Sequence, residues 1–137
     1  MPTFTSIGAM KNYILKTFDV ALEQEAFNIE QIFQRYLWTF YDEYTPTWYV
    51  RTFMLMHSFV MYDVIHTGNG AYIEGDFDGH WETGNWTDEQ ILFVNLTGSH
   101  GGVAGGTSVW GEGLADIRQT IFADMKAFLR GAGLPVV

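Results

Sequence analysis

Three side chains near the middle of the chain combine residue types and a spacing that could hold a metal ion. Asp76, Asp78 and His80 stand at alternate positions, so in an extended segment they would point to one side. Such oxygen and nitrogen donors could bind a divalent cation if further ligands came from elsewhere, and a small metal-dependent hydrolase is one hypothesis. Loops are rich in aspartate, however, and no His-Glu-x-x-His motif is present. We therefore interpret the segment as a solvated loop and expect no catalytic residue, no metal and no cofactor.

A glycine-rich segment at 98–106 invites comparison with a phosphate-binding loop. It contains five glycines around His100. A P-loop ends in Gly-Lys followed by Ser or Thr, whereas this segment has no lysine and no Gly-x-Gly-x-x-Gly spacing. Its acidic surroundings would also repel phosphate. We interpret it as a loop that becomes ordered against a partner, so docking is expected rather than catalysis.

The composition excludes several classes of function. The 137 residues suffice for one domain with its own core, and the chain has no cysteine for disulfide or thiolate chemistry. Sixteen acidic against seven basic residues give a net charge of −9, which disfavours nucleic-acid binding because that depends on Lys and Arg. We expect no sequence-specific nucleic-acid partner, no membrane span and no signal peptide. Aromatic residues, at 17%, exceed what a small core holds, so some rings should meet a partner.

The charges are unevenly distributed along the chain. No lysine or arginine lies between residues 52 and 117, a stretch that holds nine acidic residues, whereas the last twenty residues carry three basic residues and one acidic residue. The acidic middle is either an ordinary solvated surface or a surface that steers a complementary neighbour, including another copy of the chain. In the second interpretation, acidic residues from Asp63 to Glu89 would face three basic residues of a neighbour: Arg118, Lys126 and Arg130.

The hydrophobic pattern predicts a single α+β domain over residues 1–137. Apolar residues recur at steps of three and four in two long segments, which is typical of amphipathic helices. Asn69-Gly70 is typical of a tight hairpin turn, and Thr87 with Gln90 fits a helix-capping box. We expect a long N-terminal helix and a C-terminal helix packed on a small antiparallel β-sheet. In chain order, the predicted elements are a long helix at 9–42, a β-hairpin at 59–77, a short helix at 88–97, a glycine-rich loop at 98–106 and a C-terminal helix at 112–130.

A stiff aromatic turn is predicted after the long helix. Tyr44, Pro46 and Tyr49 would form it, and Arg51 could pair with an acidic residue at the helix end. The turn is either a structural corner that locks the helix to the sheet or part of a contact between subunits.

Two segments resemble a family of phage proteins. The first carries the run Tyr41-x-x-Tyr44-x-Pro46-x-x-Tyr49-x-Arg51-Thr52-x-x-Leu55-x-x-Ser58. The second consists of His100-Gly101-Gly102, then Trp110, and a closing helix with Met125-Lys126-x-x-Leu129. Together with the long leading helix, these segments are similar to the minor structural proteins of tailed phages, which act at the head–tail junction as neck, connector or tail-completion components.

The resemblance implies an antiparallel sheet flanked by a long N-terminal and a C-terminal helix, assembly into a ring at the phage neck, and no enzymatic activity. The expected partners are further copies of the chain and neighbouring head–tail proteins, and the expected location is the virion, after synthesis in the host bacterial cytoplasm. A soluble adaptor that binds one host protein is a third hypothesis, beside the hydrolase. The candidate interface residues are Tyr44, Tyr49, Arg51, Trp81, Trp86, His100, Trp110, Arg118, Lys126 and Arg130.

Overall fold

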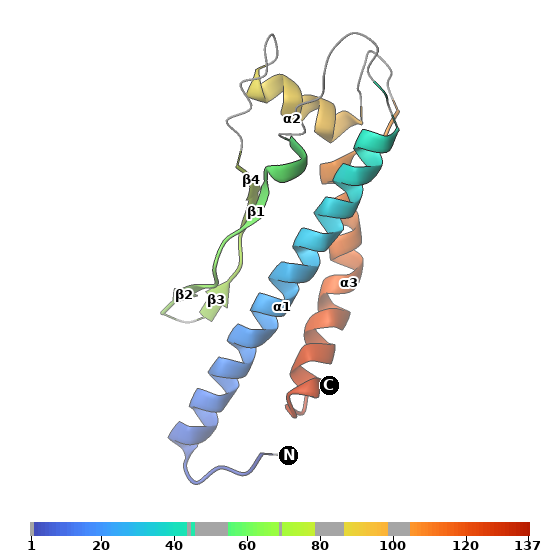
Figure 1. Ribbon diagram of the computed structural model, residues 1–137. Coiled ribbons are helices and arrows are strands. Elements are labelled where there is room, and N and C mark those ends of the chain that lie inside the picture. Colours follow the sequence, from blue (N-terminus) through green and yellow to red (C-terminus); the bar gives the residue numbers. More distant parts are fainter. Residues whose placement is uncertain (1, 44, 46–54, 69, 79–86, 99–104) are drawn as a thin grey trace.

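The computed structural model confirms an α+β fold with a long N-terminal helix, a C-terminal helix and a small antiparallel β region (Figure 1). The structure describes residues 2–43, 45, 55–68, 70–78, 87–98 and 105–137. The described elements are α1 (Ile7–Asp42), the 3₁₀ helix η1 (Leu55–His57), β1 (Phe59–Met61), β2 (Ile65–Thr67), β3 (Gly70–Tyr72), β4 (Gly75–Phe77), α2 (Asp88–Thr97) and α3 (Val109–Gly131).

The long helix α1 begins two residues earlier than predicted and ends at the predicted residue, Asp42. Its N-cap is Ser6, whose side chain accepts a hydrogen bond from the amide of Ala9 at 3.1 Å. A serine oxygen at this position satisfies one of the amides that the first helical turn leaves without a partner. The cap therefore fixes the start of the helix although Gly8 weakens the first turn.

The predicted hairpin is confirmed, and it consists of two ladders whose registers differ by one residue. Phe59 pairs with Phe77 in the first ladder (β1 and β4), and Ile65 pairs with Tyr72 in the second (β2 and β3). Between the ladders, residues 62–64 stand opposite only residues 73–74. One extra residue on one strand is a bulge, which changes the direction of the strand and the side to which the following side chains point.

The two later helices also begin at capping residues. The capping box of α2 is present: the Thr87 side chain accepts from the Gln90 amide, and the Gln90 side chain accepts from the Thr87 amide. The helix ends at Gly98, which adopts the left-handed conformation that favours glycine. Helix α3 begins at Val109 rather than at the predicted residue 112, because Ser108 caps it through the amide of Gly111.

The glycine-rich loop that follows α2 is described only at its two ends, since residues 99–104 lie outside the described residues. These ends are held together: the amide of Gly106 donates to the carbonyl oxygen of Gly98 at 2.7 Å. The loop therefore leaves and returns at one point, directly before α3 begins.

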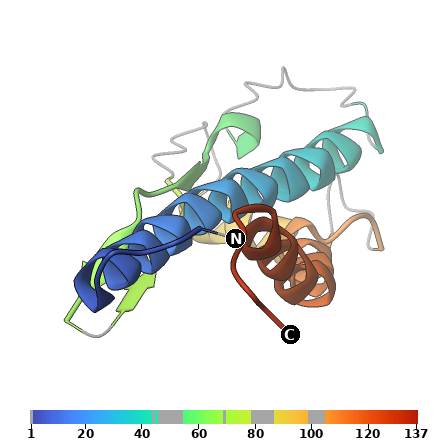
Figure 2. The same cartoon turned by 90° about the horizontal axis from the view of Figure 1, so that it is seen from below.

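The hairpin and α3 flank α1 on two different sides, and α2 crosses one end of this arrangement (Figures 1 and 2). Helix α3 packs chiefly on α1 and α2, whereas the hairpin packs on α1 through β1. The two sides meet in a buried aromatic cluster at which Phe33 of α1 contacts Phe59 and Phe77 of the hairpin, with ring centroids 4.2 and 5.9 Å apart. No helix in the described part of the chain is long and apolar enough to cross a membrane.

Candidate assembly surfaces

The structure places four of the ten predicted interface residues, all of them on α3. These are Trp110, Arg118, Lys126 and Arg130. The other six lie outside the described residues: Tyr44, Tyr49, Arg51, Trp81, Trp86 and His100.

Trp110 lies against the aromatic core rather than fully on the surface. Its half-buried ring stacks on that of Phe33, with centroids 5.5 Å apart and planes at 29°, and lies 5.8 Å from the ring of Phe77. The first turn of α3 therefore touches both α1 and the hairpin through one indole. This contact gives Trp110 a packing role that holds three elements together.

Arg118, which is exposed, and Lys126, which is half-buried, bracket an exposed aromatic ring on α3. Phe122 stands four residues from each, so the three side chains share one helix face, and 85% of Phe122 is exposed. Neither Arg118 nor Lys126 forms an ion pair with any described residue. We call Arg118, Phe122 and Lys126 the basic face of α3.

Two of the three acidic residues of α3 lie against α1. Asp116 forms an ion pair with Arg35 and accepts a 3.3 Å hydrogen bond from the hydroxyl of Tyr36. Asp124 lies close enough to Glu25 of α1 to affect its titration. Asp116 and Asp124 thus lie against α1, whereas the third acidic residue, Glu112, is exposed near the start of the helix.

Arg130, the third predicted basic residue, holds the end of the chain. Its Nε donates to the carbonyl oxygen of Val136 at 2.9 Å. The amides of Gly133 and Leu134 return to the last turn of α3, donating to the carbonyl oxygens of Arg130 and Leu129. Arg130 therefore binds within its own chain, and its side chain is less available to a neighbouring copy than those of Arg118 and Lys126.

The hairpin carries the opposite charge. Its exposed residues include Asp63, Glu74 and two tyrosines, Tyr62 and Tyr72, of which 45% and 46% are exposed. No lysine or arginine occurs anywhere between residues 52 and 117. We call Tyr62, Asp63, Tyr72 and Glu74 the acidic face of the hairpin. Like the basic face of α3, it combines charges of one sign with exposed aromatic rings.

The proposed metal ligands are only partly described. Asp76 and Asp78 are both exposed on either side of the buried Phe77, as alternation along a strand requires, whereas His80 lies outside the described residues. The Asp76 carboxylate accepts a 2.7 Å hydrogen bond from the amide of Phe77. Within the described ranges, no group of three His, Cys, Asp or Glu side chains is arranged to hold a metal ion.

Glu25 is the most unusual titratable residue of the described structure. Only 1% of it is exposed, and neither of its carboxylate oxygens has a hydrogen-bond partner among the described residues. Burial raises the pKa of the Glu25 carboxyl, and the negative charge of Asp124 raises it further. A charged Glu25 therefore destabilises the α1–α3 interface.

Several of these surface features could have been found in the sequence, because they break its periodicity. Phe122 falls off the apolar stripe of its helix, and an apolar residue off the stripe must face solvent or a partner. Glu25 shows the opposite signal, since it stands three residues after Leu22 and four before Ile29, inside the stripe of α1. Phe27 and Trp38, which are also exposed, fall off that stripe.

No protein-family model, curated protein or solved structure matches this chain.

Proposed function

We propose that the protein is a non-enzymatic structural subunit of a tailed phage that assembles head to tail into a ring at the head–tail junction. One observation carries the assembly part of this proposal: α3, which carries the basic face, and the hairpin, which carries the acidic face, lie on different sides of α1 (Figures 1 and 2). A head-to-tail contact joins two different patches of neighbouring copies, and its repetition gives a ring when the rotation closes. The resemblance of the sequence to phage neck and connector proteins supports the virion part.

The chemistry of the two faces is complementary. Arg118 and Lys126 supply positive charge around the exposed ring of Phe122. On the hairpin, Asp63 and Glu74 supply negative charge beside exposed tyrosine rings. Opposite charges orient the approach of two copies, whereas burial of the aromatic rings supplies most of the affinity.

A charge-swap experiment tests the head-to-tail contact. In Arg118→Glu/Lys126→Glu both faces are acidic, and in Asp63→Lys/Glu74→Lys both are basic. We expect each variant to sediment as a smaller species than the wild type, because its two faces repel each other. A mixture of the two variants restores both contacts and should recover the large assembly. If each variant alone assembles like the wild type, or if the wild type is monomeric at every concentration, the head-to-tail contact is refuted.

Salt and location provide two further tests. Since Arg118, Asp63 and Glu74 are exposed, high salt should screen their charges and shift the wild type toward smaller species. Quantitative mass spectrometry of purified virions of a phage that encodes this chain should find it at several copies per particle. A chain that is absent from virions and instead binds one host protein stoichiometrically would support the adaptor hypothesis and contradict the virion part.

A further inference from the structure

The side of α1 between the hairpin and α3, away from the aromatic core, carries large apolar residues that no described element covers. Val20, Phe27 and Trp38 are 49%, 57% and 55% exposed. They belong to a series with alternating steps of four and three residues, which keeps all its members on one helix face. We call this series the α1 seam: Val20, Gln24, Phe27, Gln31, Gln34 and Trp38.

The seam has no charged residue, although the chain carries a net charge of −9. Its six positions hold three apolar side chains and three glutamines, which neither repel nor attract another copy at long range. Alternating steps of four and three residues are the spacing of a coiled-coil interface. The seam is therefore suited to contact a second helix of the same kind.

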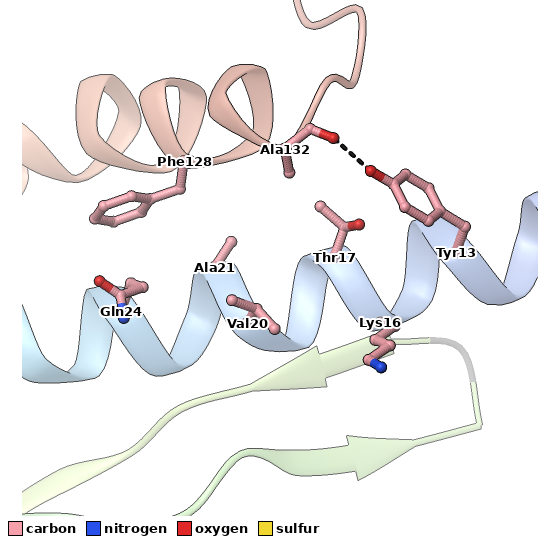
Figure 3. A pocket seen from close by; sticks show the side chains of 8 residues that line it. All are labelled: Tyr13, Lys16, Thr17, Val20, Ala21, Gln24, Phe128 and Ala132. Atoms are coloured by element: carbon pink, nitrogen blue, oxygen red, sulfur yellow. Dashed lines mark hydrogen bonds between the residues drawn. The ribbon is translucent and has the colours of Figure 1, made fainter. Parts of the chain in front are cut away.

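A groove lies at the N-terminal end of the seam, where α3 ends beside α1 (Figure 3). Its volume is about 370 Å³, and Phe128 and Ala132 form the α3 side. The hydroxyl of Tyr13 donates to the carbonyl oxygen of Ala132 and closes one end of the groove. On the α1 side, the lining residues are Tyr13, Lys16, Thr17, Val20, Ala21 and Gln24. A groove of this size can accept a large side chain from another helix.

We propose that the α1 seam joins two copies of the chain through an antiparallel, two-fold contact between their α1 helices. In the register that places Val20 opposite Gln24 of the partner subunit, position 27 lies opposite position 17. Phe27 of the partner subunit then faces the groove around Thr17, and the symmetry repeats this contact on the other side. This interface is separate from the head-to-tail contact and does not depend on it.

The charges beside the seam select this register and favour a second copy as the occupant. Lys16 and Glu30 stand on the same flank of the seam, and the register brings Lys16 next to Glu30 of the partner subunit, again twice. The side chain of Phe27, the groove that receives it, and the charges of Lys16 and Glu30 are thus all present on this one chain. Glu23 lies at the two-fold axis and meets its own copy there, which weakens the contact.

Disulfide cross-linking can test the register, because the natural chain has no cysteine. We expect Val20→Cys and Gln24→Cys, mixed under mild oxidation, to form a dimer that contains one copy of each variant. Adjacent positions across the interface satisfy the short Cβ separation that a disulfide requires. The matched control is Asn12→Cys on the same helix, which lies far from its copy and should not cross-link. Cross-linking of Gln24→Cys mainly to itself would indicate parallel helices and refute the register, and absence of any cross-link would refute the interface.

Two seam variants with opposite expected effects test the affinity. Phe27→Ser should weaken dimerisation by about tenfold or more, since it removes the side chain that enters the groove. Glu23→Gln should strengthen it, because the like charges at the axis are gone. Phe27 and Glu23 are both exposed in the isolated chain, so circular dichroism of the two variants should show unchanged folding. Equal dimerisation of the wild type and Phe27→Ser would overturn the inference.

The two proposed contacts can be separated in one experiment. In Arg118→Glu/Lys126→Glu, which disables the head-to-tail contact, we expect dimers that persist in high salt, because the seam itself is uncharged. Phe27→Ser should keep the salt-sensitive head-to-tail assembly. A monomeric Arg118→Glu/Lys126→Glu variant would refute the seam interface and leave the head-to-tail contact standing.

Discussion

Gly113 on α3 lies directly against the aromatic ring of Phe33 on α1. A Cβ atom at position 113 would lie 2.7 Å from Cε1 of Phe33 and 3.0 Å from Cδ1. Phe33 is itself 2% exposed and is surrounded by other rings, so it has little room to move. The absence of a side chain at Gly113 is therefore what lets the two long helices approach at the aromatic cluster.

We expect Gly113→Ala to destabilise the protein although alanine is the better helix former. The close contact with Phe33 forces a shift in the core, at a cost of about 1–3 kcal/mol, which outweighs a gain of about 1 kcal/mol in helix propensity. Urea unfolding monitored by circular dichroism measures the difference. Gly131→Ala in the same helix is the matched control, since nothing lies within 4 Å of its added Cβ. A Gly113→Ala variant as stable as Gly131→Ala would contradict the close contact.

Gly98 and Gly105 allow backbone strain to be separated from steric overlap. Both have positive φ angles, +64° and +100°, but a Cβ at Gly98 would lie 1.8 Å from the carbonyl oxygen of Gly106, whereas one at Gly105 meets nothing within 4 Å. Gly105→Ala should cost only the conformational term, about 1–2 kcal/mol. Gly98→Ala should cost clearly more, because the ends of the loop must also separate. Denaturant midpoints of the two variants measure this, and equal losses would be inconsistent with the loop closure.

The carboxylate of Glu43, at the end of α1, binds the residue that precedes the N-cap of α3. It accepts a 2.7 Å hydrogen bond from the amide of Thr107 and a second one from the Thr107 hydroxyl. Because Thr107 is buried, Glu43→Ala leaves both donors without this acceptor and should cost about 1–3 kcal/mol. Asp42→Ala, at the exposed neighbouring position, is the control and should change the free energy of unfolding far less. Differential scanning calorimetry compares the two variants.

The periodic and capping signals of the sequence predicted the helices and the hairpin, because these signals are local. The stripe of α1 and the capping box at Thr87 depend only on residues a few positions apart. The early start of α3 was not predicted because Gly111 and Gly113 weaken the helical pattern of the sequence. In the structure the amide of Gly111 donates to the capping side chain of Ser108, and the absence of a side chain at Gly113 makes room for Phe33. The hairpin bulge depends on how two strands pair, which no single segment encodes.

For the candidate surfaces, the sequence predicted which residues carry charge better than it predicted which side chains are exposed. It identified Arg118 and Lys126 by counting basic residues, and on α3 the first is exposed and the second half-buried. It also selected Trp110, whose ring packs on Phe33, because composition alone cannot tell a ring in the core from a ring on the surface. The exposure of Phe122 was not predicted, although its position off the apolar stripe of α3 signals it.

The buried carboxyl of Glu25 predicts an unusual dependence of stability on pH. Its pKa is raised in the folded protein, chiefly by burial and in addition by Asp124. The folded state therefore binds more protons than the unfolded state between the ordinary glutamate pKa and the raised one. The contribution of Glu25 to the free energy of unfolding is therefore highest below the ordinary glutamate pKa. It falls as the pH rises toward the raised pKa, by at most about 1.4 kcal/mol per pH unit. This trend is opposite to that of a carboxylate stabilised by a salt bridge.

Glu25→Gln isolates this contribution because it keeps the shape of the side chain and removes its titration. Relative to the wild type, we expect the variant to gain stability as the pH rises above the ordinary glutamate pKa, and to show no gain below it. Gly131→Ala, which changes no titratable group, should show no such pH-dependent gain. Asp124→Asn should reduce the pH dependence only partly, because burial is the larger cause of the raised pKa. Urea unfolding of all four proteins across a pH series measures these differences, and parallel curves for wild type and Glu25→Gln would show that Glu25 is not buried in its charged form.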